Sequence, residues 1–415
     1  MSATANNTVI IGAGIIGLST AYYLSDSKTI PPSSIHLVDA SKELLHCASG
    51  WAGGFLAADW FAPSNASLGA LSFKLHKDLS DRYNGRNTWG YCLSTGFSAT
   101  QPQDCEAAVG GSGEDWLADG TSRVQATDSK RSVRMGPEWL KRTEEGTVEE
   151  ISAQGTVAQI DPLRFCQWLL DQCLQRGVKI HQPARVISVS KNEDGLFDGV
   201  RLSEDGIEKE LPCKRLVICS GAWSPKVFSS LFPKSKTRIP VFHLAGHSLL
   251  VKNQFYKVEE KDSEVCHAVF ATDTLGFSPE WFSRIGGELY LAGLNSTAIP
   301  LPDAEESVKV DPKAIEQMKQ CAAEMLGAVD GKPMEVKREA LCFRPVTASG
   351  RPIVCRIPEE NLGGLKTQGG GGVFIATGHG AWGISLAPGT GFVLSELIQG
   401  RAPSANISAL ALPSL

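Results

Sequence analysis

The sequence has no apolar run that approaches the roughly 20 residues a membrane-spanning helix requires. It also has no excess of positive charge, because 40 Lys and Arg residues stand against 45 Asp and Glu residues, with a formal net charge of −5 and a pI near 6.0. Nucleic acids and anionic membrane surfaces need clustered cations. We therefore expect no transmembrane segment, no nucleic-acid partner and a small-molecule ligand.

Paired cysteine motifs are absent as well. The eleven cysteines include no Cys-x-x-Cys pair and no Cys/His spacing typical of zinc, which predicts reduced thiols, no metal and an intracellular, most simply cytoplasmic, protein. The first residues lack the basic start of a secretory signal. The C-terminal Pro-Ser-Leu lacks the basic middle residue of a peroxisomal signal, so peroxisomal association is kept only as an alternative.

A nucleotide-binding pattern opens the chain. Residues 8–11 are β-branched and apolar, a Gly-x-Gly-x-x-Gly segment follows, and a helical pattern runs to residue 24. The first glycine permits the tight turn, the second lets the backbone approach a pyrophosphate, and the third lets the helix pack on the strand. The cofactor-binding candidates here are Gly12, Gly14, Ile15, Ile16 and Gly17.

A second predicted strand, residues 34–38, ends in Asp39, whose carboxylate would accept hydrogen bonds from ribose hydroxyls. Ala40 and Ser41 follow it and join the candidates. The small-residue segment 47–55 comes next and could lie against an extended diphosphate and a flavin ring, or could be a plain surface loop. Its candidates are Ser49, Gly50, Gly53 and Gly54.

Further strands of the same sheet are predicted far along the chain. Residues 186–189 and 215–219 read as strands, and residues 373–377 read as a buried strand followed by a glycine-rich turn and a helix from about 388 to 398. One Rossmann sheet is thus expected to draw on three separate parts of the sequence.

These blocks, in this order, resemble the D-amino-acid oxidase family of FAD-dependent oxidoreductases, which includes glycine, sarcosine and fructosyl-amino-acid oxidases. The resemblance rests on the opening fingerprint and on VICSGAW, CFRPVTASGRP and ATGHGAWGISLAPGTG. The stretch ASGWAGGFLAADW also resembles a eukaryotic oxidoreductase branch with a yeast member linked to endosomal sorting, which leaves an endosomal association open.

The resemblance implies where FAD would lie. It places the Val186 backbone near the adenine and Gly221, with Ser220 and Trp223 beside it, near the diphosphate. It also implies that backbone N–H groups of the last block bind the flavin pyrimidine edge and stabilise negative charge on reduced flavin. That block supplies Gly378, His379, Gly380, Ala381, Trp382, Gly383 and Ile384. A simple glycine-rich strand-to-helix turn is the alternative.

Arg344 is the most informative candidate for the chemistry. A guanidinium can hold a carboxylate through two parallel hydrogen bonds, and the resemblance implies this role for the arginine of the FRP sequence; the alternative is a structural arginine. Cys342 lies two residues earlier and would face the same side of a strand. The resemblance to sarcosine and fructosyl oxidases implies a covalent link from Cys342 to FAD, against an inert buried thiol.

His243 and His247 precede the substrate region and could accept a proton from an ammonium substrate, although a structural role is the commoner fate of such histidines. Trp51 and Trp382 are candidates for walls of the flavin site or for plain packing. Oxidising an amine needs no acid–base pair when the nitrogen is already deprotonated, because flavin N5 accepts the hydride.

We expect an α/β (α+β) two-domain protein. Residues 1–75, 151–225 and 336–415 form a Rossmann-type FAD-binding domain, and residues 76–150 and 226–335 form a discontinuous mixed-sheet substrate-binding domain. Residues 101–150 are rich in Gly, Ser and charge and are expected to form a surface insertion, either a lid or a loop without function.

The leading hypothesis is an FAD-dependent oxidase of a small amine or amino acid that uses O2 and gives an imine and H2O2. A flavin-dependent dehydrogenase with another acceptor, and an FAD-binding protein with a structural or trafficking role, are the alternatives.

Overall fold

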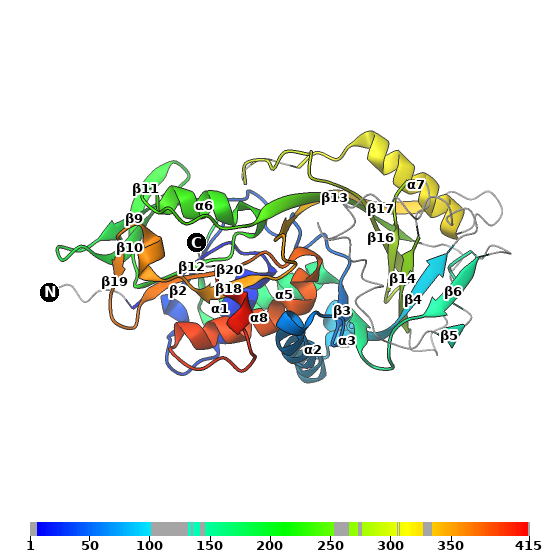
Figure 1. Ribbon diagram of the computed structural model, residues 1–415, viewed down its shortest axis with the longest axis horizontal. Coiled ribbons are helices and arrows are strands. Elements are labelled where there is room, and N and C mark those ends of the chain that lie inside the picture. The colour runs from blue at the N-terminus through cyan, green and yellow to red at the C-terminus, as the bar shows by residue number, and fades with distance from the viewer. Residues whose placement is uncertain are drawn as a thin grey trace.

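The computed structural model describes residues 6–100, 132–133, 136–141, 146–252, 265–272, 276–304, 306, 308–326 and 334–413. Two large sheets dominate an elongated molecule, with helices packed around one of them and a single helix over the other (Figure 1). The predicted insertion 101–150 lies largely outside the described residues. The mixed α/β architecture predicted from the sequence is confirmed.

The six-stranded sheet is the Rossmann sheet. Its strand order is β18-β20-β12-β1-β2-β8, and every neighbouring pair is parallel except β18 with β20. The predicted convergence is confirmed for the strands near residues 8–11, 34–38, 215–219 and 373–377. The prediction was wrong for residues 186–189, which lie in a strand of the small sheet described below, because strand periodicity does not say which sheet a strand joins. The strands are β1 (Thr8–Ile11), β2 (Ile35–Val38), β8 (Lys179–His181), β12 (Arg215–Ile218), β18 (Ile353–Arg356) and β20 (Gly372–Thr377).

Helices cover one face of this sheet because its four central strands, β1, β2, β12 and β20, are fully buried runs that must be shielded on both sides. One continuous apolar core joins the sheet to five helices (Figure 1). Within it, α1 packs against both α8 and α5. The helices are α1 (Ile15–Ser25), α2 (Pro63–Tyr83), α3 (Gly85–Trp89), α5 (Pro162–Arg176) and α8 (Gly383–Ile398).

The opposite face of the Rossmann sheet carries a second core, formed with a small four-stranded sheet and helix α6 (Ser224–Leu231). Short 3-10 turns connect several elements, at Pro32–Ser34, Gly221–Trp223, Glu359–Leu362, Gly380–Trp382 and Ser408–Leu410. The four strands of the small sheet are β9 (Ala184–Lys191), β10 (Leu196–Glu204), β11 (Ile207–Pro212) and β19 (Lys366–Thr367).

The ten-stranded sheet forms the other half of the molecule, and its main path is β17-β13-β16-β15-β14-β4-β6-β5. Helix α7 (Pro312–Leu326) packs on its outer face, and an aromatic cluster covers its inner face. Its strands are β3 (Phe55–Ala57), β4 (Cys92–Thr100), β5 (Ser132–Val133), β6 (Thr147–Glu150), β7 (Val157–Gln159), β13 (Phe242–Lys252), β14 (Cys266–Ala271), β15 (Glu280–Arg284), β16 (Glu288–Ser296) and β17 (Glu335–Val346).

Two expected domain boundaries fall inside or at the start of packed elements. The boundary after residue 75 divides α2, whose residues Leu68 and Leu79 belong to the same Rossmann core. The boundary before residue 336 gives β17 to the FAD-binding part, whereas β17 pairs along its length with β13 of the ten-stranded sheet. We therefore propose boundaries near residues 91 and 347. None of the helices in the described ranges is long and apolar enough to cross a membrane.

Helix α8 begins at Gly383, five residues before the start predicted from Pro388. Proline has no N–H and leaves the carbonyl four residues earlier without its helical partner. Here the side chains of α2 supply the missing donors: His76 Nε2 lies 2.9 Å from the Ile384 oxygen, and Ser72 Oγ donates to the Ser385 oxygen at 2.6 Å. Tertiary contacts thus let the helix continue through the proline.

We expect Ser72→Ala to destabilise the protein by about 1–3 kcal/mol, because it removes a donor to one buried helical carbonyl and the acceptor of Gly389 N–H. Urea unfolding followed by tryptophan fluorescence measures this. Ser33→Ala, at an exposed position of the turn before β2, is the control and should change stability little. Equal stabilities of the two variants would contradict the repair of the α8 backbone by α2.

Candidate active site

The candidate site lies at one edge of the Rossmann sheet. Because β1, β2, β12 and β20 are parallel, their carboxyl ends meet at this edge, where α/β sheets bind ligands. Ile11, Ile218 and Ile375 stand in register across three of these strands. The predicted loops that follow the four strands are therefore brought together, although they come from distant parts of the sequence.

The glycine fingerprint forms the tight turn between β1 and α1. A Cβ on Gly17 would lie 1.9 Å from the Gly12 oxygen, so the helix can approach the turn only with glycine at this place. Gly14 is the N-cap of α1 and offers no side chain, while Ser49 Oγ accepts a hydrogen bond from Ile15 N–H at 2.9 Å. The N-terminus of α1 thus presents its dipole and backbone donors toward the sheet edge.

Asp39 braces this turn at the end of β2. Its carboxylate accepts hydrogen bonds from Ala13 N–H at 2.8 Å and from Ser41 N–H at 2.9 Å. The Asp39 carbonyl accepts from Ala184 N–H at 2.8 Å, which joins the start of β9 to the same place. Val186, buried two residues later on β9, is thereby held near Asp39, and its contact with the adenine stays a prediction.

Two Gly-Ala-Trp turns follow the neighbouring strands β12 and β20. Gly221 and Gly380 adopt left-handed backbone conformations, with φ of +53° and +55°, and no atom lies within 4 Å of where a Cβ would stand on either glycine. Thr377 Oγ1 donates to the Gly221 oxygen at 2.9 Å and ties the turns together. Together with the α1 N-terminus, these open backbone surfaces fit an extended dinucleotide.

Packing within the protein also requires the small residues of segment 47–55, whose contact with the cofactor stays a prediction. A Cβ on Gly53 would lie 2.5 Å from the Phe282 ring, and one on Gly54 would lie 2.1 Å from the Ile160 oxygen. A Cβ on Gly50 would lie 2.2 Å from the Leu45 oxygen. Close packing within the protein requires these glycines, whatever the loop contacts on its other side.

Cys342 and Arg344 lie on the inner face of β17, as their spacing predicts. Arg344 Nη1 donates to Asn295 Oδ1 at 2.6 Å, and a Cβ on Gly246 would lie 2.2 Å from Arg344 Nη1. The missing side chain on β13 therefore lets the guanidinium lie across the sheet, where Asn295 of β16 orients it. No motif pointed to Asn295 or Gly246, because only strand pairing brings them to Arg344.

His243 and His247 do not converge with Arg344. In the antiparallel register Leu244 stands opposite Arg344 and Gly246 opposite Cys342, so the odd-numbered positions of this part of β13 face the outer side. His243 Nε2 lies 3.0 Å from the Ile299 oxygen. His247 Nε2 accepts from Asp311 N–H at 3.2 Å, and burial lowers the pKa of this histidine. Both rings support the loop before α7 and do not face the site.

The three candidate tryptophans, Trp51, Trp223 and Trp382, differ in the groups that they contact. Trp382 packs against Phe61, with ring centroids 4.8 Å apart, at the end of the α8 turn. The Trp51 ring lies 5.3 Å from His46, and the Trp51 carbonyl accepts from Tyr290 Oη at 3.0 Å. Trp223 Nε1 donates to the Pro302 oxygen at 2.8 Å, so its indole is directed toward the loop before α7.

A match to the family of FAD-dependent oxidoreductases called DAO extends over residues 7–397. The chain belongs to this family. The resemblance stated from the sequence is confirmed, and the chain is an FAD-dependent oxidoreductase. Residues of the fingerprint, Asp39, the start of β9 and the two Gly-Ala-Trp turns are those that would hold FAD.

Relatives extend over nearly the whole chain. A "Putative oxidoreductase" of Schizosaccharomyces pombe is 28% identical over 423 residues, which cover 97% of each chain. Glycine oxidase from Geobacillus kaustophilus has a similar fold, with a TM-score of 0.73, 16% identity and coverage of 99% of this chain and 98% of that one. Iminodiacetate oxidase from Chelativorans sp. BNC1 has a TM-score of 0.69 at 17% identity, with coverage of 98% and 99%.

We expect FAD to leave the protein on acid precipitation. Burial raises the pKa of Cys342, and although Arg344 and Arg338 act in the other direction, the thiol stays protonated and poorly nucleophilic. The absorption of supernatant and pellet after precipitation measures this, with Cys342→Ser as the control for flavin retained by other means. Yellow colour that stays in the wild-type pellet and leaves the Cys342→Ser pellet would contradict this expectation.

We expect the free energy of unfolding to fall in mild acid, because burial holds His379 neutral in the folded state. It is buried, its Nε2 lies 3.1 Å from Thr390 Oγ1, its Nδ1 has no partner, and burial lowers its pKa to about 3. An unfolded histidine has a pKa near 6.5, so the unfolded state binds a proton that the folded state excludes as pH falls from about 6.5 toward 3.

Urea unfolding of the FAD-saturated protein at pH 7.5 and pH 5.0 measures this loss. His379→Gln keeps one polar contact and removes the titration, so its stability should fall less between the two pH values. His46→Gln, at an exposed position, is the control and should behave like the wild type. A pH response unchanged by His379→Gln would show that His379 is not responsible.

Proposed function

We propose that this protein oxidises the C–N bond of a small amino acid or carboxylated amine, with O2 as the electron acceptor and an imine and H2O2 as products. The observation that carries the proposal is the placement of Arg344 on the inner face of the ten-stranded sheet, oriented by Asn295 and lying across Gly246. Glycine oxidase and iminodiacetate oxidase, which share the fold, support a substrate of this class.

Arg344 supplies orientation in this proposal. Its planar guanidinium carries donors in a fork that matches a carboxylate, and one Nη1 bond to Asn295 fixes the plane of that fork. Holding the carboxylate at one end of a small substrate fixes the carbon next to nitrogen relative to the sheet edge. When bound, FAD supplies the acceptor for the hydride equivalent that leaves this carbon.

The surroundings of Arg344 favour an apolar reaction space. Tyr290, which interacts electrostatically with Arg344, belongs to a buried aromatic cluster on the inner face. Its other aromatic members include Phe55, Trp60, Phe270 and Phe282. Such a wall excludes water and strengthens the ion pair between the guanidinium and a carboxylate. Because neither His243 nor His247 faces this side, the proposal takes the amine as entering without its extra proton and assigns no general base.

Replacing Arg344 by alanine should raise KM for an acidic substrate and lower kcat/KM by roughly 30-fold to 1000-fold, the equivalent of about 2–4 kcal/mol for a charge-assisted bidentate pair. The rate with an amine that has no carboxylate should change little. A panel of amino acids and amines, assayed for H2O2, measures both. Arg351→Ala, at an exposed arginine of the same sequence block, is the matched control.

The assay separates the parts of the proposal. An unchanged kcat/KM in Arg344→Ala would exclude the carboxylate role but leave the oxidase function standing. Reduction of the bound FAD by substrate without H2O2 release would exclude O2 as the acceptor and favour a dehydrogenase. Failure of every amine and amino acid on the panel to reduce FAD in the loaded protein would overturn the C–N oxidation itself.

A further inference from the structure

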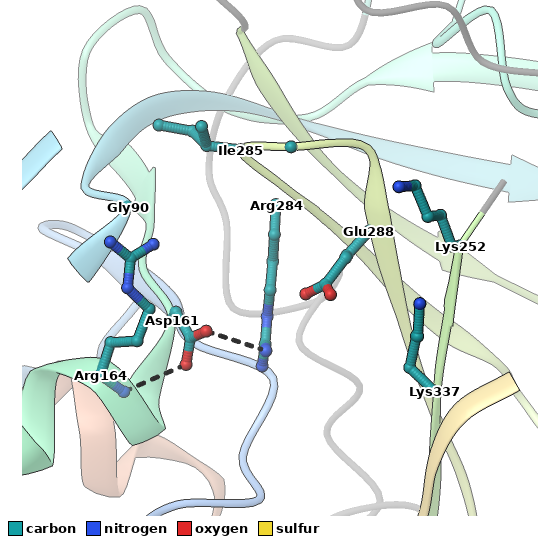
Figure 2. Close-up of a pocket in the computed structure, with 9 residues that line it drawn as sticks. Gly90, Asp161, Arg164, Lys252, Arg284, Ile285, Glu288 and Lys337 are labelled. Carbon is teal, nitrogen blue, oxygen red and sulfur yellow. Dashed lines mark hydrogen bonds and ion pairs between the residues drawn. The ribbon is translucent and has the colours of Figure 1, made fainter. Parts of the chain in front are cut away.

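A cavity lies away from the Rossmann edge, beside the turn between β15 and β16. It has a volume of about 310 Å³, and charged side chains from both halves of the molecule converge on it (Figure 2). Arg284 stands in its centre, with Asp161 and Arg164 of the α5 start on one side and Glu288 with two lysines on the other. The charged residues that line it are Asp161, Arg164, Lys252, Arg284, Glu288 and Lys337.

Arg284 is the buried member of this set, with only 6% of its surface exposed. Its Nη2 donates to the Ala52 oxygen at 2.9 Å, and its Nη1 lies 3.7 Å from Asp161 Oδ2. Its Nε is buried and has no hydrogen-bond partner. A buried guanidinium N–H without an acceptor is costly and points to a ligand that supplies one.

The charges around the cavity do not balance. Four cationic side chains face two carboxylates, and one of these, Asp161, already accepts hydrogen bonds from Leu163 N–H at 3.0 Å and Arg164 N–H at 3.3 Å as the cap of α5. Arg338, whose Nη2 is buried without a partner, adds positive charge because it lies close enough to Arg284 to interact with it electrostatically. Glu335, whose Oε1 lies 2.5 Å from Lys337 Nζ, adds a third carboxylate. With Arg338 included, five cationic side chains therefore stand against three carboxylates, and the formal excess of two positive charges matches a dianion.

This cavity is separate from the proposed substrate position. Lys337 precedes Arg344 by seven residues on β17, a span of about 23 Å along an extended strand. Between them on the inner face lie Tyr290, over whose ring Arg284 stands at 5.6 Å, and Cys342. Ligands at the two places would not compete for the same side chains.

We propose that this cavity, which we call the Arg284 pocket, binds the phosphoryl dianion of a small phosphorylated molecule or free phosphate. Arg284 contributes fixed donors at the base, and Lys252 and Lys337 contribute charge at the exposed rim. The volume accommodates a phosphate group with a short carbon substituent. The inference does not depend on the proposed oxidation, because none of these residues belongs to the FAD-binding or substrate-binding set.

The test uses the full chain loaded with FAD, so that the dinucleotide site is already occupied. Isothermal titration calorimetry with inorganic phosphate and, separately, with glycerol 3-phosphate should show one saturable site that weakens as NaCl rises from 50 to 300 mM. The tighter of the two ligands identifies whether the free ion or the ester is preferred. The double variant Lys252→Ala/Lys337→Ala should bind at least fivefold more weakly while it retains FAD.

The matched control is Lys74→Ala/Lys77→Ala, which removes two exposed lysines of α2 that form i,i+4 ion pairs away from the pocket. It should bind phosphate like the wild type. Absence of saturable binding for both ligands, or equal weakening in the two double variants, would overturn the proposal. Neither result would bear on amine oxidation, which is measured separately.

Discussion

The parallel register of β1, β12 and β20 is the constraint on which the rest of the structure depends. It sets Ile11, Ile218 and Ile375 side by side, so that the turns after all three strands open at one edge. The contact of Gly17 with the Gly12 carbonyl holds the first of these turns, and the bond from Thr377 to the Gly221 carbonyl joins the other two. A cofactor that spans this edge would therefore contact, as one surface, segments that are more than 350 residues apart in the sequence.

Periodicity and local chemistry predicted the Rossmann strands, the fingerprint and Asp39, because those signals lie within single segments. The side that a strand residue faces was less accessible, since a shift of one residue in pairing exchanges the faces. Cys342 and Arg344 lie together because they share one strand, whereas His243 and His247 lie on β13 and their orientation depends on its register with β17. A single sequence gives no information on that register, so the orientation of the two histidines toward the outer side could not be predicted.

Tertiary contacts explain the other differences between sequence and structure. Pro388 is a sound local signal for a helix start, yet His76 and Ser72 supply the donors that let α8 begin earlier, at Gly383. The same α8 turn carries the residues expected at the flavin, so α2 stabilises the site from 300 residues away in sequence. The approach of Gly53 to the cofactor stays a prediction, and the contact with the Phe282 ring independently requires a residue without a side chain there. A glycine in a sequence can indicate a close contact, but it does not identify the contacting group.

The inner face of the ten-stranded sheet carries positive charge at both ends and aromatic rings between them. Arg344 lies at one end and Arg284 at the other, and Tyr290 lies between them: Arg284 stands over its ring at 5.6 Å, and Arg344 interacts with it electrostatically. Arg284 Nη2 donates to the Ala52 carbonyl, in the loop that leads from Ser49 toward β3, and Ser49 in turn accepts a hydrogen bond from Ile15 of the fingerprint. Because Arg284 keeps its bond to that carbonyl while its Nε faces the pocket, a dianion bound there would be connected through one side chain to the loop on the side where FAD is expected.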